Sequence, residues 1–203
     1  FGNADIHHTI HGLRWAPWGD LHFTQSIYIN SFIETAYGSR VLNGSGIWSF
    51  RPETEALKVY CRGLVNPWGE AFDEWGQTFA TDGAGSSGMN YVFPESAHRS
   101  AVGAAEILDG LNSGTPKNTA AEMVFSRHFP RDWQGTIITN DFRANRTIRY
   151  KVTPYKSGYR SEEVELVLRS DHRSYRPIDS KIGPDGALYI VDWYNPIIDH
   201  GEV

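Results

Sequence analysis

Cysteine is almost absent from the sequence, because Cys61 is the only one among 203 residues. A single cysteine excludes an internal disulfide, a zinc cluster built on cysteines and a Cys-x-x-Cys-His haem site within these residues. Cys61 follows the strand-like segment 57–60, so we expect its thiol to be packed in the core rather than reactive.

Basic clusters and long apolar runs are missing as well. The formal net charge is −5 and no run of Lys or Arg stands out, which disfavours a nucleic-acid partner. No segment approaches the ~20 apolar residues that a membrane-spanning helix needs. No phosphate-binding loop, dinucleotide fingerprint or Gly-x-Ser-x-Gly motif is found, so nucleotide-dependent and serine-hydrolase chemistry have no support.

The sequence begins with Phe1 rather than Met and ends at Val203, soon after two strands of a new repeat. We therefore expect an internal piece of a longer protein, forming one incomplete domain over residues 1–203. Segments outside it would carry any signal, anchor or further domain.

Glycine, proline and aromatic residues are what the sequence has in quantity. It contains 20 Gly, 10 Pro and 7 Trp, and aromatic residues make up 13%. This composition is typical of short strands joined by many turns, with large rings filling the space between sheets. We expect an all-β fold.

A repeated pattern of turn followed by strand predicts the arrangement of those strands. A glycine that ends a turn precedes a short apolar strand roughly every 55 residues, at Gly19, Gly76, Gly135 and Gly186. This period fits blades of about four strands, and so predicts a partial β-propeller with about three to four blades of a six-bladed whole, truncated at both ends. The alternative is an unrelated all-β protein in which turn-flanked strands simply recur.

The last repeat shows the pattern most clearly. Segment 178–193 is predicted to form two strands joined by a two-residue turn at Asp185-Gly186. The run 187–191 is almost wholly apolar, which predicts an inner strand buried on both faces that brings Asp192 to an accessible edge.

Further segments of the blades follow from the same signals. We expect outer strands at 46–50, 57–60, 89–93, 146–152 and 164–168, and a third blade opening with 121–125 and 136–139. One short helix is predicted at 101–108.

Polar side chains end the strands that we expect to line the channel. These are Gln25, Asp82, Asn140 with Asp141, and Asp192. Equivalent strand ends share one mouth of a propeller, so this ring of oxygens is suited to a hard cation such as calcium or to a polyol. The alternative is that each Asp only caps a turn.

Histidines cluster before the first predicted strand, at His7, His8 and His11. An imidazole at a channel mouth is suited to general-base catalysis because its usual pKa is near ~6.5. We take His8 and His11 as candidate catalytic bases; the alternative is solvated side chains. Zinc binding lacks a matching carboxylate spacing.

Four segments carry a family resemblance: HHTIHGLRWAP, NPWGEAFDEWGQTFATDGAG, DWQGTIITNDFRANR and RPIDSKIGPDGALYIVDWYNPIIDHGEV. In these four segments the chain resembles the PVC-type membrane-bound dehydrogenases, whose propeller is similar to that of the soluble quinoprotein sugar dehydrogenases. The resemblance to the first family extends over essentially the whole chain. The second similarity depends on short motifs.

The resemblance implies roles for individual residues. His8 lies nine residues before Pro17, at the spacing of the family's base, with His11 as its rival. Asn66-Pro67 matches an Arg-Asn-Pro motif that contacts pyrroloquinoline quinone (PQQ), although Val65 replaces the arginine. The remaining candidates are a calcium site at Asp82, Gly83 and Ala84, and cofactor contacts at Asn66, Gly83, Ala84, Asp141, Arg176 and Asp192.

Two functions follow as hypotheses. The first is an oxidoreductase that oxidises a carbohydrate or other small alcohol with PQQ and calcium. The resemblance also implies export to the periplasm or outer envelope, and an electron-accepting cytochrome module whose haem lies outside these residues. The second is a non-catalytic propeller that binds glycans or a partner protein, since a fold does not fix a function.

Overall fold

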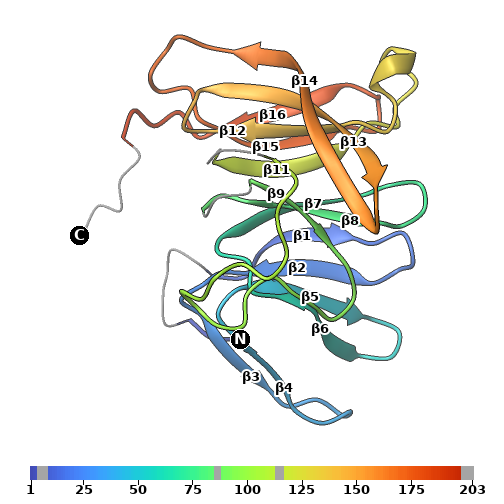
Figure 1. Ribbon diagram of the computed structural model, residues 1–203, viewed down its shortest axis with the longest axis vertical. Helices are drawn as coiled ribbons and strands as arrows, with labels where there is room; N and C mark the ends of the chain where they lie inside the picture. Colours follow the sequence, from blue (N-terminus) through green and yellow to red (C-terminus); the bar gives the residue numbers. More distant parts are fainter. Residues whose placement is uncertain (4–8, 85–87, 113–116, 198–203) are drawn as a thin grey trace.

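The computed structural model describes residues 1–3, 9–84, 88–112 and 117–197. It is all-β, as expected; the one helical element among the described residues is the short 3₁₀ turn η1 (Arg131–Trp133). Four successive sheets, here called blades one to four, follow one another along the chain, and Figure 1 shows them stacked from the blue strands to the red ones.

Blade one contains β1 (His11–Trp15), β2 (Leu21–Gln25), β5 (Gly46–Arg51) and β6 (Ala56–Arg62), with β10 (Ser96–Ala97) added at its outer edge. Between β2 and β5 the chain forms a separate hairpin of β3 (Asn30–Ile33) and β4 (Arg40–Asn43). The predicted outer hairpin is confirmed as β5 and β6.

The described parts of blades two to four each contain fewer strands than blade one. Blade two contains β7 (Pro67–Phe72), β8 (Thr78–Asp82) and β9 (Met89–Val92); blade three contains β11 (Asn118–Met123), β12 (Ile137–Asp141), β13 (Arg146–Tyr155) and β14 (Gly158–Arg169); and blade four contains β15 (Pro177–Ile182) and β16 (Leu188–Asp192). Strands β13 and β14 are longer than predicted, and β11 begins before residue 121.

The first strand of each blade is the inner one. Strands β1, β7, β11 and β15 contact one another in that order, and the later strands of each blade follow outward. The second strands, which carry the candidate aspartates and were expected to be inner strands, lie directly next to these innermost ones. Buried side chains form three clusters. One joins blades two and three, one joins blades one and two and contains the fully buried Cys61, as expected, and one joins blade one to the β3–β4 hairpin.

The four turn glycines are equivalent, as the repeat predicted. All have positive φ, at 90°, 78°, 71° and 80° for Gly19, Gly76, Gly135 and Gly186, and each N–H donates to the carbonyl of the residue that opens its turn. Three of the turns have a three-residue loop. The fourth, in blade three, is enlarged by the segment that carries η1.

Two local predictions at the last repeat were wrong. The Asp185-Gly186 turn is a three-residue loop, because Gly183 and Ala187 are hydrogen-bonded to each other and Pro184 joins the loop. Strand β16 is not buried on both faces, since Tyr189 is 56% and Val191 52% exposed. No third strand of blade four lies within the described part of the chain, so β16 is an edge strand.

The predicted helix at 101–108 does not form. The segment contains turns and one isolated bridge between Arg99 and Glu106, whose side chains also form an ion pair at 2.9 Å. Gly103 has φ of 79°, which a right-handed helix does not allow. A segment this short also gains too few internal hydrogen bonds to hold a helix alone.

Candidate functional site

The predicted site residues that the structure describes lie at one end of the blades, here called the rim, where β1, β7, β11 and β15 begin and where β2, β8, β12 and β16 end. The turn glycines lie at the opposite end of the same strands. Contacts run between blades along the rim: Ser26 Oγ donates to Asn66 Oδ1 at 2.7 Å, and the Thr119 hydroxyl donates to the Pro177 carbonyl at 3.2 Å. In Figure 1 the rim faces left.

Asp82 is the most buried of the rim carboxylates, at 3% exposed. Its oxygens accept three backbone hydrogen bonds, from Val65 at 2.8 Å, Asn66 at 2.8 Å and Ala84 at 3.1 Å. Burial raises the pKa of the Asp82 carboxyl, and the three N–H groups together with the charge of Arg99 act in the opposite direction. The carboxylate therefore ties the start of β7 to the end of β8.

Asp192 repeats this arrangement in blade four. Its Oδ1 accepts from the backbone N–H groups of Arg176 at 2.7 Å and Tyr194 at 2.8 Å, as Asp82 accepts from Asn66 and Ala84. Arg176 directs its guanidinium to the carbonyls of Phe142, Arg143 and Asn195, so that it fixes the rim of blade three.

Asp141 and Gln25 occupy the corresponding strand ends of blades three and one. Asp141 Oδ1 accepts from the Ala144 N–H at 3.3 Å, and Oδ2 lies 3.6 Å from Arg146. Gln25 is fully buried, where its amide donates to three carbonyls and accepts from Ser31 and Trp48. All four side chains thus make structural hydrogen bonds at the rim.

His11 begins β1 and lies against Trp68 of β7, with 5.2 Å between ring centroids. Its Nδ1 lies 2.6 Å from the Thr9 carbonyl oxygen and its Nε2 lies 2.9 Å from that of Pro67. Both ring nitrogens therefore face carbonyl oxygens in this conformation. His7 and His8 lie outside the described residues.

The residues present do not fit a calcium site built on Asp82, Gly83 and Ala84. The Asp82 oxygens are directed to backbone N–H groups, and the Gly83 N–H donates to the Asn66 carbonyl at 2.8 Å. Within the described ranges no three His, Cys, Asp or Glu side chains gather in a way that could hold a metal ion.

Two rim residues were missed by the sequence reasoning. Asn118 is fully buried at the start of β11, and neither its amide nitrogen nor its amide oxygen has a hydrogen-bond partner. Its backbone carbonyl lies against Gly83. Lys117 precedes it; burial lowers the pKa of this ammonium, nearby Arg143 lowers it further, and Asp82 acts in the opposite direction.

These two residues were missed because the enlarged loop of blade three shifts the spacing between its turn glycine and its first strand. Counting back from Gly76 and Gly186 reaches Pro67 and Pro177, whereas counting back from Gly135 falls inside the loop. The strand register shows the true equivalence, because Asn118 lies opposite Asp141 as Pro67 lies opposite Asp82 and Pro177 opposite Asp192.

A family model described as a domain of unknown function, DUF7133, matches residues 1–126 and 115–203. The chain belongs to this family. No curated protein matches the DUF7133 chain.

Solved structures show the fold. A "putative oxidoreductase (glucose dehydrogenase)" from Thermus thermophilus superposes with a TM-score of 0.69 at 20% identity, covering 100% of this chain and 64% of that one. The PQQ-bound aldose sugar dehydrogenase of Streptomyces coelicolor gives 0.63 at 15% identity, covering 96% and 60%. The apo soluble aldose sugar dehydrogenase of Escherichia coli gives 0.57 at 13%, covering 91% and 79%.

These similarities confirm the partial β-propeller and identify its architecture as that of propeller-type sugar dehydrogenases. The DUF7133 chain spans less than two thirds of the Thermus and Streptomyces chains. Within its described residues, no helix is long and apolar enough to span a membrane.

Proposed function

We propose that this DUF7133 chain is the propeller part of a quinoprotein-like oxidoreductase that oxidises a carbohydrate or other small alcohol at the rim. The observation that carries the proposal is the Asn118 amide, which is fully buried, without a hydrogen-bond partner, and next to the partly buried cation Lys117. An unpaired buried amide is costly, so a polar group that binds there would be strongly favoured.

The rim supplies the chemistry that a carboxylated quinone such as PQQ needs. Lys117 and Arg143 would hold carboxylates, replacing the charge lost at Val65, and the amides of Asn118 and Asn66 would hold quinone or substrate oxygens. Bound PQQ would accept a hydride from the alcohol carbon. His8 or His11 would take the hydroxyl proton; His11 can do so only after one of its ring nitrogens leaves the carbonyl oxygen that it faces.

The proposal includes the narrower resemblance to PVC-type membrane-bound dehydrogenases. It also includes export to the periplasm or outer envelope and electron transfer to a cytochrome module elsewhere in the full-length chain. Calcium has no place in the proposed mechanism, because the residues described at the rim do not fit it.

The experiment is a titration of the full-length protein with PQQ, with calcium or with chelator, followed by absorbance and by dye reduction with sugars and short alcohols. We expect PQQ to bind without calcium and dye to be reduced. Lys117→Ala and Asn118→Ala should each weaken PQQ binding, whereas Lys151→Ala on the exposed side of β13 should not. Failure of PQQ to bind would overturn the proposal, and so would binding that depends on calcium.

Two observations favour a second function, a non-catalytic propeller that binds glycans or a partner protein. The Asp82 carboxylate is committed to backbone hydrogen bonds, and the family's cofactor arginine is Val65 in this sequence. Sugar binding without PQQ binding in the same titration would support this function.

A further inference from the structure

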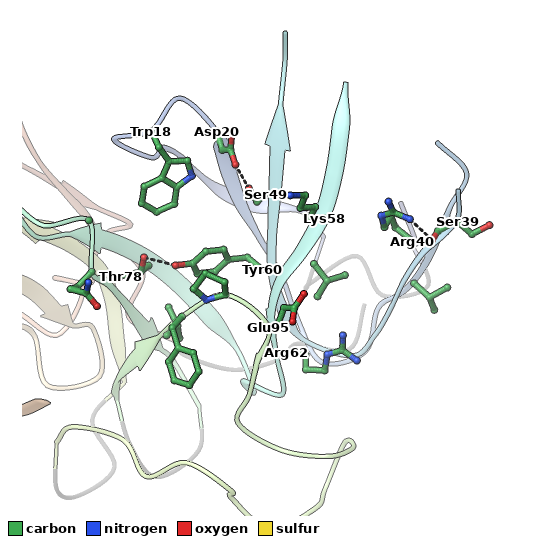
Figure 2. Close-up of a pocket in the computed structure, with 17 residues that line it drawn as sticks. Trp18, Asp20, Ser39, Arg40, Ser49, Lys58, Tyr60, Arg62, Thr78 and Glu95 are labelled. Atoms are coloured by element: carbon green, nitrogen blue, oxygen red, sulfur yellow. Dashed lines mark hydrogen bonds between the residues drawn. The ribbon is translucent and has the colours of Figure 1, made fainter. Parts of the chain in front are cut away.

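A second groove lies away from the rim, between the outer part of blade one and blade two. It has a volume of about 1080 Å³, just above the ~300–1,000 Å³ typical of ligand sites. Figure 2 shows its walls: Trp18 and Tyr60 on one side, the β3–β4 hairpin with Arg40 on another, and the turn with Glu95 below. None of the rim candidates lines it.

Aromatic rings form part of the lining. Trp18 is 37% and Phe93 40% exposed, and both border the groove. Trp18 is held in place, because it stacks on Tyr60 at 6.4 Å and 22° and rests against Gly76 of the next blade. The Tyr60 hydroxyl is hydrogen-bonded to Thr78 at 2.9 Å. These rings offer fixed flat faces to a ligand.

Positive charge in the groove exceeds negative charge. Arg40, Lys58 and Arg62 line it, and none forms an ion pair among the described residues; Arg40 donates only to the carbonyls of Leu57 and Ser39. Of the acids lining the groove, Asp20 is already bound by Ser49 and Arg51. A chain of net charge −5 therefore leaves three cations unpaired in one groove.

Glu95 provides a further sign of a ligand. It follows Pro94 in a turn closed by the hydrogen bond from Ser96 N–H to the Phe93 carbonyl at 3.0 Å, and its φ is 65°. That is the third position of a type II turn, which favours glycine because other residues are strained there. A glutamate at this position offers a carboxylate to the groove at a cost in backbone energy.

We propose that this groove binds an acidic oligosaccharide, whose charged groups are uronate carboxylates or sulfate esters. The cations would pair with those groups, the aromatic faces would pack against sugar rings, and Glu95 would accept hydrogen bonds from hydroxyls. A nucleotide offers fewer hydroxyl groups than an oligosaccharide for the Glu95 carboxylate to accept from. The proposal does not depend on oxidoreductase activity at the rim.

Isothermal titration calorimetry of the full-length protein without PQQ tests it. The probes are tetragalacturonate, a sulfated tetrasaccharide, neutral maltotetraose and ATP. We expect one or both acidic oligosaccharides to bind, more weakly as salt is raised, and maltotetraose and ATP to bind at least tenfold more weakly. The comparison of the two acidic probes identifies the charged group.

Variants locate the binding. The double variant Lys58→Gln, Arg62→Gln and the single variant Trp18→Ala should each weaken binding roughly tenfold. Lys151→Gln on blade three is the matched charge control and should bind as the parent does. Glu95→Gly should weaken binding while leaving thermal stability equal or higher, because glycine relieves the strained turn.

Glu55→Gly is the control for the Glu95→Gly variant. Glu55 also has positive φ, 58°, but does not line the groove. It should gain stability without loss of binding. Three results would overturn the proposal. Neither acidic probe binds; ATP binds as tightly as the acidic probes; or Trp18→Ala and the double variant remain folded and bind as the parent does.

Discussion

His22 Nδ1 lies 2.8 Å from Glu70 Oε1, and both side chains are fully buried. The pair joins β2 of blade one to β7 of blade two, under a cover formed by Trp18, Tyr60 and Phe72. The other oxygen of Glu70 and the other ring nitrogen of His22 have no partner. The contact between these two blades therefore includes a buried polar pair whose members have no other side-chain hydrogen-bond partner.

This pair leads to the first prediction. Glu70→Ala should lower the free energy of unfolding by about 3–5 kcal/mol, because it leaves His22 buried and unpaired. The double replacement His22→Leu, Glu70→Leu should cost less than the sum of the two single leucine variants, since both polar groups leave together. Urea unfolding measures each value. Additive losses would show that the pair has no coupling.

The second prediction ranks three glycines. Gly76→Ala and Gly135→Ala should each cost about 1–2 kcal/mol, because both have positive φ and little crowds the added methyl group. Gly69→Ala should cost more than about 4 kcal/mol, because its Cβ would overlap the Ala120 backbone where β7 meets β11. Thermal unfolding of the three variants gives the order, and a mild effect at Gly69 would contradict such close packing of the inner strands.

The third prediction concerns pH. His98 is 1% exposed with both ring nitrogens unpaired, and burial lowers its pKa to about 4. Between pH ~6.5 and 4 the unfolded chain binds a proton that the folded chain does not, so stability should rise with pH across this window, by up to about 3 kcal/mol. His98→Leu should flatten that slope in urea unfolding at pH 4.5 and 6.5. An unchanged slope would show that another group causes it.

Much of the fold could be predicted from the sequence. Gly19, Gly76, Gly135 and Gly186 mark the blades because positive φ is a local requirement that glycine meets at little cost. Strand lengths and order within a blade were less accessible. The bounds of β11 and the exposure of β16 depend on which strands pair, which the local pattern does not contain.

The candidate site, like the fold, could be predicted only in part. The sequence placed Asn66, Asp82, Asp141, Arg176 and Asp192 at the strand ends of the repeat, because their spacing from the turn glycines recurs from blade to blade. What those side chains do there was decided by their neighbours: three N–H groups around Asp82 and three carbonyls around Arg176.

The sequence alone determined the all-β repeat, the turns and the polar strand ends, since these follow from the backbone preferences and side-chain period of neighbouring residues. Only the tertiary structure decided that Asn118 is left unpaired beside Lys117, that His11 faces two carbonyls, and that Trp18, Arg62 and Glu95 share a groove. Those groups belong to different strands and blades, and folding alone brings them into contact.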